Sequence, residues 1–290
     1  MGGVLGTQMT NARHKNNALS DDDFKFICEF VYQRSGIVLA DNKREMVYRR
    51  FTRIVRERKL SAFSDYCELL RQQPEQEENY FINAITTNLT SFFREQHHFE
   101  YLKEHEIPQL LKQNVHKKRI RIWSSASSTG EEPYSIAMTI LEAMEHKLSA
   151  WDVKILATDI DSNVLTTCKN GIYESKKLGD LSEHYKKKYF HKGLGEANQN
   201  KYKVDKKLTN LLTFKQLNLL HEWPMKGPFD VIFCRNVIIY FDKTTQQDLF
   251  ARYYQLLAPG GLLMLGHSEN LGNYQQYFET VGRTMFRKPY

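Results

Sequence analysis

The sequence has no apolar run long enough to cross a membrane. The longest candidate, FDVIFCRNVIIYF, is interrupted by Arg235 and Asn236 and is far shorter than the ~20 residues that a spanning helix needs. The opening segment, MGGVLGTQMTNARHKNNALS, also lacks the apolar core of a secretory signal peptide. We therefore expect a cytoplasmic protein that does not insert into the membrane, with residues 1–19 as a mobile polar tail.

Cysteine is scarce as well. The chain has four cysteines in 290 residues, and none of them has CxxC spacing: Cys28, Cys67, Cys168 and Cys234. Isolated cysteines of this kind predict free thiols in a reducing compartment rather than a disulfide framework. No cluster of cysteine and histidine has metal-ligand spacing, so we expect no bound metal.

Positive charge is present but concentrated. The net charge is +7, and residues 41–60 hold eight lysines and arginines against three acids. Arg49, Arg53 and Arg56 are spaced to line one face of a helix. This face is either simply solvated or a docking strip for an acidic partner. Because no aromatic-rich RNA-binding motif accompanies it, we favour an acidic protein surface over nucleic acid.

The first part of the chain reads as helical. Ser20 and Asp23 have capping-box spacing before an apolar-periodic segment that ends at Gly36. The basic helix follows, and two more helices are predicted in SAFSDYCELLRQQ and EENYFINAITTNL. Residues 20–90 are therefore predicted to form a small all-α domain.

From about residue 118 the pattern changes to short apolar runs that alternate with helical segments. These runs are RIRIWSSA, WDVKILATDID, LLTFKQLN, FDVIFCRNVIIY and GGLLMLGHSE. Such alternation predicts βαβ units and a parallel sheet covered on both faces, so we assign residues 91–290 to an α/β domain. Ligands of such sheets bind at the carboxyl ends of the strands.

One interval between two predicted strands is too long for a simple crossover. Residues 174–210, approximately, are lysine-rich and carry Gly193 and Gly195 at a predicted turn. Because a structureless loop of this length is uncommon in a compact domain, we expect an inserted β-subdomain or an ordered lid. A strand edge there can accept an extended peptide, although a plain surface excursion fits the sequence equally well.

The turn SSASSTGEEP joins the first predicted strand to a helix that begins near Gly130, and Pro133 suits its first turn. Small side chains let backbone amides approach a ligand there. However, Glu131 and Glu132 would repel a pyrophosphate, and the chain has neither GxGxxG nor GxxxxGK[ST]. A cationic ligand fits better, and S-adenosylmethionine carries both an ammonium and a sulfonium.

The other strand ends support this ligand. Asp159 ends the second run, where a carboxylate can hold both ribose hydroxyls, whereas Asp161 is placed to cap the next helix. The pair Asn218–Leu219 offers an amide and an aliphatic face to an adenine. Arg235 and Asn236 follow the fourth run and need either a polar cleft or, for the arginine, a structural salt bridge.

The chain resembles the CheR-type chemoreceptor glutamate methyltransferases of bacterial chemotaxis in six collinear stretches: TNLTSFFRE, SSTGEEPYSIAM, ATDID, NLL, FDVIFCRNVIIYFD and LAPGGLLMLGHSEN. The resemblance covers residues 20–290. It implies a small all-α N-terminal domain and a Rossmann-like S-adenosylmethionine-dependent methyltransferase domain with an inserted β-subdomain. It further implies methyl transfer to receptor glutamates, with S-adenosylhomocysteine as the second product.

The resemblance also implies roles for individual residues, with Glu132 favoured over Glu131 for the methionine end and Arg94 and Tyr240 beside the transferred methyl. The cofactor residues that it implies are Asn88, Thr90, Arg94, one of Glu131 and Glu132, Asp159, Asn218, Leu219, Arg235 and Asn236. Arg49, Arg53 and Arg56 match the helix that docks the methylation region of the receptor. One departure is SSASS, where many relatives have a glycine or cysteine near Ala126 and Ser127.

The predicted partner is the cytoplasmic domain of a chemoreceptor. The insert matches the part that, in some members of the family, binds a pentapeptide at the receptor C-terminus. We expect a monomer, because no large apolar surface stripe is evident. Two alternatives remain at this point: a methyltransferase acting on nucleic acid or a small molecule, and a non-catalytic module that binds the cofactor and signals.

Overall fold

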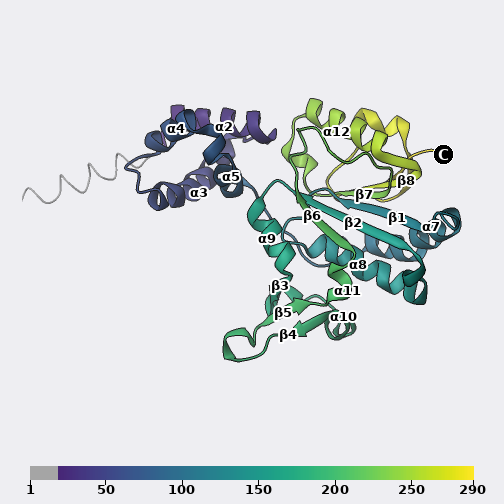
Figure 1. The fold of residues 1–290 in the computed structure, drawn as a ribbon. Helices are drawn as coiled ribbons and strands as arrows, with labels where there is room; N and C mark the ends of the chain where they lie inside the picture. The colour runs from purple at the N-terminus through teal and green to yellow at the C-terminus, as the bar shows by residue number, and fades with distance from the viewer. Residues whose placement is uncertain (1–18) are drawn as a thin grey trace, which may run out of the picture. The chain divides into compact units, whose positions relative to one another are not determined.

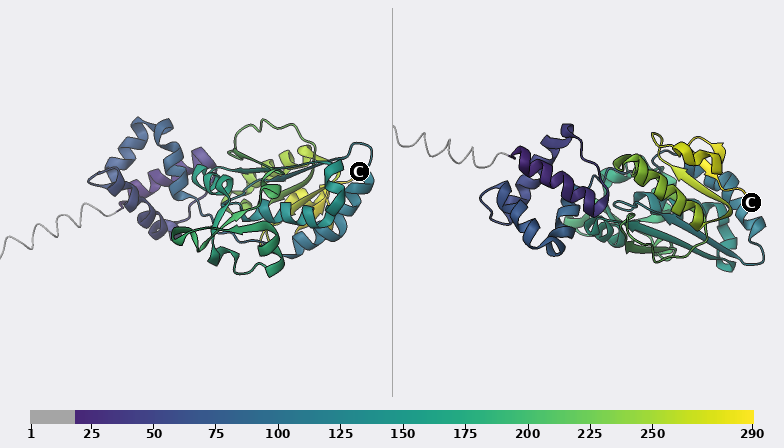
Figure 2. Two further views of the ribbon diagram at one scale, coloured as in Figure 1. Left: turned by 60° about the horizontal axis from the view of Figure 1, so that its bottom comes forward. Right: turned by 90° about the horizontal axis from the view of Figure 1, so that it is seen from above.

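The computed structural model describes residues 19–290, so the predicted N-terminal tail falls, except for Leu19, outside the described residues. The chain divides into two compact units, Met1–Thr87 and Asn88–Tyr290. The first contains helices, and the second contains a sheet with helices on both of its faces (Figures 1 and 2).

The described part of the first unit is all-helical. Its helices are α2 (Asp21–Ser35), α3 (Arg44–Glu57), α4 (Phe63–Gln72) and α5 (Pro74–Ile85). Ser20 caps α2 by accepting the N–H of Asp23 at 3.1 Å, and Gly36 ends it in the left-handed conformation with φ 69°. Phe51 packs between Tyr66 and Phe81, which joins three of the helices around one aromatic core.

Helix α5 differs from its expected bounds. The sequence suggested a helix over 77–89, whereas the structure begins it at Pro74 and ends it at Ile85. Proline is favoured in the first turn because its missing N–H would have no intrahelical partner there. The end is set by Thr86, which is extended with ψ 147°. The helix therefore ends there, and Arg50 of α3 donates hydrogen bonds to the Thr86 carbonyl at 2.7 Å and to Thr87 Oγ1 at 3.0 Å.

The second unit is built on a seven-stranded sheet with the order β6-β2-β1-β7-β8-β10-β9. The strands are β1 (Arg119–Ser124), β2 (Asp152–Asp159), β6 (Leu212–Gln216), β7 (Phe229–Cys234), β8 (Leu257–Leu265), β9 (Glu279–Gly282) and β10 (Met285–Arg287). The first five of these pair in parallel, as the apolar runs predicted. The antiparallel hairpin β9–β10 was not predicted.

The strand order reverses between β1 and β7. From β1 the chain builds outward through β2 to β6, and it then returns to place β7 on the other side of β1. The register brings Ser124 at the end of β1 beside Ala157 of β2 and Phe233 of β7. Such a switch point opens a crevice at the carboxyl ends of the strands, where α/β sheets bind ligands.

Each face of the sheet has its own core. Ile120 and Ile122 of β1 pack with α7 (Ile107–Gln113) and α8 (Glu131–Met144) on one face. Trp123 points to the other face and packs with residues of α12 (Lys243–Leu256). Helices α8 and α12 accordingly lie on opposite sides of the sheet (Figure 1). This arrangement fixes β1, and with it the turn that follows it.

The long interval between β2 and β6 folds into a small subdomain, in agreement with the predicted fold class. After α9 (Ser162–Asn170) come β3 (Ile172–Glu174), α10 (Glu183–Tyr189), β4 (Phe190–Lys192), β5 (Lys201–Val204) and α11 (Lys206–Thr209). The three strands form an antiparallel sheet in the order β3-β5-β4, which leaves β3 and β4 as edges. Gly195, with φ 78°, lies in the connection from β4 to β5.

A π-helical segment, Leu102–Glu106, joins α6 (His97–Tyr101) to α7.

All four cysteines are unpaired, as predicted. Within residues 19–290 no helix combines the length and the apolar character that a membrane crossing requires.

Candidate functional site

The turn after β1 is held by its own backbone amides. The N–H of Ser125 donates to the Phe233 carbonyl at 2.9 Å and that of Ser127 to the Thr158 carbonyl at 2.8 Å. The N–H of Ser128 donates to Asp159 Oδ2 at 2.8 Å. Because these amides point into the protein, they do not form a phosphate cradle, which agrees with the missing glycine-rich signatures.

Gly130 closes this turn in a conformation that favours glycine, with φ 102°. A Cβ atom at this position would lie 2.6 Å from both Cys168 Sγ and Tyr173 Oη. Tyr173 also donates a hydrogen bond from its hydroxyl to the Thr129 carbonyl at 2.8 Å. The first strand of the inserted subdomain therefore lies directly against the turn.

The two glutamates that open α8 point in different directions. Glu131 accepts hydrogen bonds from Thr129 Oγ1 at 2.6 Å and from Lys177 Nζ of the insert at 3.1 Å. Glu132 accepts them from Ser124 Oγ at 2.7 Å and from Arg235 Nη1 at 2.9 Å. Burial raises the pKa of the Glu132 carboxyl, and Arg235 opposes that shift. Of the two, Glu132 is the carboxylate at the β1–β7 switch point.

Arg235 joins the strand ends to the segment before α6. Besides Glu132, its guanidinium pairs with Glu95 Oε2 at 3.2 Å and donates to the Arg94 carbonyl. Its side chain is 1% exposed. Burial acts to raise the pKa of Glu95, but Arg235, His267 and Asn236 lower it to about 2. Of the two environments that the sequence allowed for Arg235, a polar cleft or a structural salt bridge, the structure shows salt bridges.

Asp159 ends β2 with both carboxylate oxygens in use and both able to accept more. Oδ2 accepts the Ser128 N–H at 2.8 Å and Oδ1 accepts the Asp161 N–H at 3.0 Å. Each oxygen keeps a second lone pair, which suits it to a pair of ribose hydroxyls. Burial raises its pKa to about 6. Asp161 caps α9, as expected, by accepting the N–H groups of Asn163 and Val164.

The segment 88–96 carries three of the predicted residues to the same edge. Asn88 donates from Nδ2 to Asp161 Oδ2 at 2.8 Å, and its carbonyl accepts from Ser128 Oγ at 3.0 Å. Arg94 donates from Nη1 to the Leu89 carbonyl at 2.9 Å. Thr90 is half-buried between them. The segment is thereby anchored to the ends of β1, β2 and β7.

The last predicted residues follow β6 and β7. Asn218 accepts the Leu220 N–H on Oδ1 at 3.0 Å, and Leu219 is buried. Asn236 follows Arg235 directly, has φ 57°, and its Nδ2 contacts Glu95 Oε1 at 3.3 Å. Tyr240 ends the 3-10 turn Ile238–Tyr240 on the same loop and is half-buried.

Two segments of the chain match known protein families. Residues 88–287 match the family described as "CheR methyltransferase, SAM binding domain", and residues 22–86 match "CheR methyltransferase, all-alpha domain". The chain belongs to the CheR methyltransferase family. It is therefore an S-adenosylmethionine-dependent methyltransferase, and the predicted family and fold class are confirmed.

Curated members of the CheR family align along nearly the full chain. The "Chemotaxis protein methyltransferase" of Salmonella typhimurium is 46% identical over 271 residues, which cover 93% of this chain and 91% of that protein. The "Chemotaxis protein methyltransferase 2" of Pseudomonas aeruginosa is 43% identical over 269 residues, 91% of this chain and 92% of that protein. The solved "DhpI-SAH complex structure" aligns with TM-score 0.32 and 11% identity over 66% of this chain and 69% of that one.

The charge at the carboxyl edge fits the cofactor of this family. The carboxylates gathered there are Glu95, Glu131, Glu132, Asp159, Asp161 and Glu269, and the cationic side chains there are Arg94, Lys177 and Arg235. An excess of carboxylates favours a ligand that carries positive charge. Among residues 19–290, no group of three or more metal-ligating side chains is placed to hold an ion.

The backbone at this edge is strained. Eight described non-glycine residues have positive φ, and four of them lie here: Phe93, Glu95, Ser128 and Asn236. Each such residue costs about 1–3 kcal/mol and persists only where its surroundings over-determine it. Two of them flank Arg94, so the backbone that presents this arginine is held in an unfavourable conformation on both sides.

Sequence reasoning missed three residues of the site. Glu95 and Ser128 lie inside quoted motifs, but their partners are up to 172 residues away in the chain, and no spacing rule reveals them. Glu269 follows β8, and its position at the end of a predicted strand was the one signal that could have identified it. Its carboxylate accepts backbone N–H groups of the loop after β7.

The predicted docking strip lies within the helical unit, separate from these strand ends in the chain. Arg49, Arg53 and Arg56 are exposed on α3, while Val47, Phe51, Ile54 and Val55 of that helix are buried. A hollow of about 580 Å³ is lined by Met46, Arg49, Arg50, Arg53, Asn83, Ala84 and Thr86. The three arginines therefore share the exposed face of the helix, and its opposite face is apolar and buried.

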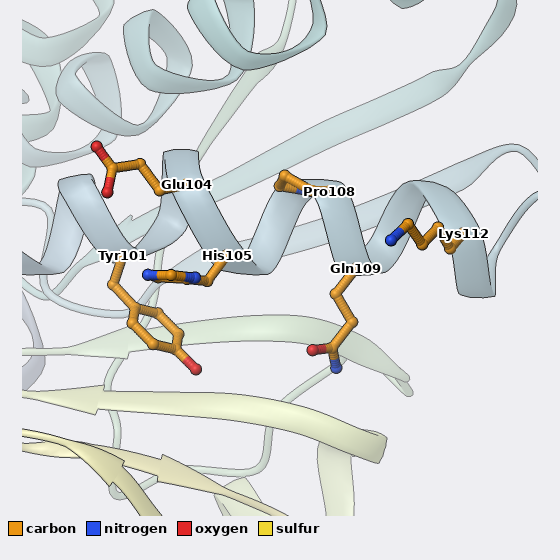
Figure 3. Close-up of a pocket in the computed structure, with 6 residues that line it drawn as sticks. All are labelled: Tyr101, Glu104, His105, Pro108, Gln109 and Lys112. Carbon is orange, nitrogen blue, oxygen red and sulfur yellow. The ribbon is translucent and has the colours of Figure 1, made fainter.

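A second hollow, of about 470 Å³, contains none of the predicted site residues. It is lined by Tyr101, Glu104, His105, Pro108, Gln109 and Lys112. Tyr101, His105 and Gln109 point to one side of the helical segment and Glu104 to the other (Figure 3). Gln109 donates to the hydroxyl of Tyr290 at 2.8 Å, so the end of the chain borders this hollow.

Proposed function

We propose that this protein transfers the methyl group of S-adenosylmethionine to glutamate side chains of chemoreceptors, forming methyl esters and S-adenosylhomocysteine. The family and the curated relatives, which are named for chemotaxis, support this activity. The observation that carries it is the pair of buried carboxylates at neighbouring strand ends, Glu132 after β1 and Asp159 on β2. This pair matches a ligand with a cationic amino-acid end and a ribose.

The cofactor-binding roles follow from these positions. Glu132 is the acceptor for the methionine ammonium, and Asp159 holds the ribose hydroxyls. Asn218 and Leu219 lie after β6, where an amide and an aliphatic face border the adenine. Asn88, Thr90 and Asn236 complete the walls, and Arg235 favours the ionised form of Glu132 and holds its carboxylate in place. Glu131 instead holds the insert through Lys177.

The chemistry asks for alignment rather than proton transfer. A glutamate carboxylate is ionised at neutral pH, so no general base is needed. The bound cofactor supplies a methyl group activated by a sulfonium. Arg94 orients the substrate carboxylate with its two-pronged guanidinium, and Tyr240 adjusts its approach. Alignment of this kind supplies up to ~7–11 kcal/mol, whereas too tight an ion pair with Arg94 would stabilise the ground state.

The substrate is a chemoreceptor cytoplasmic domain, bound in the cytoplasm by a monomeric enzyme. Its acidic methylation helices suit the exposed face of Arg49, Arg53 and Arg56 and the hollow beside it. The free edges of the inserted sheet, β3 and β4, are placed to add an extended peptide from the receptor C-terminus.

A radiolabelled methyl-transfer assay tests the proposal. Wild-type protein should label a receptor cytoplasmic fragment, and the label should be released by mild base, as expected for a methyl ester. A fragment with its methylation-site glutamates changed to alanine should stay unlabelled. Labelling of nucleic acid or of a small molecule instead, or cofactor binding without any transfer, would reject the proposal.

The two methyl-transfer residues have a test of their own. Arg94→Lys and Tyr240→Phe should lower kcat by roughly tenfold or more while the Kd for S-adenosylmethionine changes less. Wild-type kcat in both variants would remove these residues from the mechanism.

A further inference from the structure

Glu269 is a buried carboxylate that the proposed mechanism does not use. It follows β8 in the sequence GHSE and is 5% exposed. Strand β8 lies next to β7, so the carboxyl end of β8 borders the loop that carries Asn236 and Tyr240. A buried acid needs a physical reason, because an ionised carboxylate away from water is costly unless it is well hydrogen-bonded.

The Glu269 carboxylate accepts four backbone N–H groups from two loops. Oε2 accepts those of Gly266 at 2.6 Å and Asn236 at 2.8 Å. Oε1 accepts those of Ile238 at 2.9 Å and Ile239 at 3.4 Å. Burial raises the pKa of Glu269, and these four amides oppose that shift. All four donors are main-chain amides, so the Glu269 side chain fixes the backbone conformation of the two loops.

The same loop is held from its other side by α12. Gln246 donates from Nε2 to the carbonyls of Ile238 at 3.1 Å and Phe241 at 2.8 Å. Glu269 therefore accepts the N–H groups of the loop, and Gln246 donates to its carbonyls. Two side chains from different elements thus add hydrogen bonds to backbone groups of a loop whose own bonds run from the Tyr240 N–H to Val237 and from the Phe241 N–H to Ile238.

The loop also needs this support because it is strained. Asn236 has φ 57°, a left-handed conformation that a non-glycine residue adopts at a cost. Gly266 of the neighbouring loop approaches it so closely that a Cβ there would lie 2.4 Å from Asn236 Nδ2. The hydrogen bond from Asn236 N–H to Glu269 fixes the strained residue itself.

We infer that Glu269 is a positioning residue for methyl transfer. By accepting the N–H groups of Asn236, Ile238 and Ile239, it fixes the loop that presents Asn236 to the cofactor and Tyr240 to the substrate. This inference rests on the roles proposed above for those two residues. Glu269 does not touch the reacting atoms, and its effect on the rate is transmitted through the backbone.

The test compares Glu269→Gln with wild-type protein well below the unfolding temperature of both. The amide keeps the volume, but its NH₂ group cannot accept a hydrogen bond, so at least one main-chain N–H loses its acceptor. We expect kcat to fall at least about tenfold and the KM for S-adenosylmethionine to rise by a smaller factor, because a misplaced loop weakens alignment most. Hydrogen exchange at the amides of Asn236, Ile238 and Ile239 should accelerate by about tenfold or more, while exchange in β1 stays unchanged.

Glu106→Gln is the matched control. Glu106 is a fully buried carboxylate paired with Arg287 and lies outside the site. Its loss should lower the unfolding temperature while leaving kcat and exchange in the 236–239 loop within about twofold of wild type. If Glu269 were only a stability residue, the two variants would behave alike.

Two further variants keep the test decisive if Glu269→Gln does not fold. Glu269→Asp retains the carboxylate on a shorter stem and should recover part of kcat, and Gln246→Ala should loosen the same loop from its other side. Wild-type kcat together with wild-type exchange at residues 236–239, in whichever of these variants folds, would overturn the inference. Because exchange is measured without a substrate, it tests the loop even if wild-type protein fails to methylate a receptor.

Discussion

The second unit buries two arginines against glutamates, and they differ in how completely they are paired. Arg287 on β10 meets both oxygens of Glu106 and also donates to the Gly260 carbonyl and the Tyr101 hydroxyl. Arg235 after β7 is shared between Glu132 and Glu95, and its Nε has no hydrogen-bond partner. One arrangement is closed on itself, and the other is incomplete.

The surroundings of the two arginines show the same difference. Among the described residues near Arg235, three buried side-chain atoms make no hydrogen bond: Glu95 Oε2, His98 Nδ1 and Arg235 Nε. Glu95 Oε2 is nevertheless ion-paired with Arg235 at 3.2 Å. The strained residues Glu95 and Asn236 also lie beside Arg235. Polar groups without hydrogen bonds and strained backbone are tolerated where they serve function, so this contrast is the one expected if Arg287 is a structural lock and Arg235 belongs to the proposed cofactor site.

Removing each arginine is the most severe way to break this comparison. Arg235→Met leaves Glu132 and Glu95 buried without their counter-charge, and Arg287→Met does the same to Glu106. We expect each variant to lose roughly 3–5 kcal/mol of unfolding free energy, measured by urea denaturation.

Cofactor binding should then distinguish the two variants. Isothermal titration calorimetry at a temperature where both are folded should find S-adenosylmethionine affinity strongly reduced in Arg235→Met and within about threefold of wild type in Arg287→Met. Equal losses in the two variants would mean that Arg235 is no more functional than Arg287.

A change of pH is a milder test, and it addresses Asp159 at the end of β2, the strand next to β1. Asp159 has a pKa of about 6 because it is buried, and only its ionised form offers acceptors to both ribose hydroxyls. Affinity for S-adenosylmethionine should therefore fall as the pH drops below 6, by up to about tenfold per pH unit. Isothermal titration calorimetry at several pH values between 5 and 7 measures this change in affinity.

Asp159→Asn supplies the control for that profile. Its affinity should be low at every pH and nearly independent of pH over the same range, because the titrating group is gone. A wild-type profile that is flat between pH 5 and 7 would assign the ribose contact to another residue.

The smallest expected effect concerns arginines that are exposed rather than buried. Arg49→Ala, Arg53→Ala and Arg56→Ala should each raise the KM for a receptor fragment several-fold at low salt, about 3–10-fold, with S-adenosylmethionine affinity unchanged. The difference from wild type should shrink as salt is added, because exposed charges are screened within ~10 Å at 0.1 M ionic strength. If the KM of all three variants equals that of wild type at low salt, the docking surface must lie elsewhere.

Sequence patterns predicted the parallel sheet well and the C-terminal hairpin not at all. Strands β7 and β8 are largely buried, and β1 and β2 are buried at their carboxyl ends, so all four contain apolar stretches. Strand β6 (LTFKQ) is half-buried or exposed along its length and gives a weaker pattern. By contrast, β9 (Glu279–Gly282) has the letters ETVG, which are neither an apolar run nor an alternating one. Its strand character comes from pairing with β10 across a turn, a tertiary effect that local propensity does not contain.

At the candidate site, residue types were predictable and their partners were not. Glu132 and Asp159 stand at strand ends that the pattern located, so their neighbourhood followed from the topology. The salt bridge from Arg235 to Glu132 spans 103 residues, and the contacts of Glu269 are to main-chain amides, which no side-chain pattern encodes. Spacing rules describe one helix or one strand at a time, whereas these contacts depend on how separate loops meet.

The missing side chain at Gly130 limits how the inserted subdomain can be exchanged. Because Tyr173 and Cys168 fill the space where a Cβ would stand, the turn is complete only when the start of the insert covers it. A chimera that takes this subdomain from another relative must therefore keep Tyr173 and begin the graft after β3. The start of the subdomain, up to β3, therefore belongs structurally to the turn after β1.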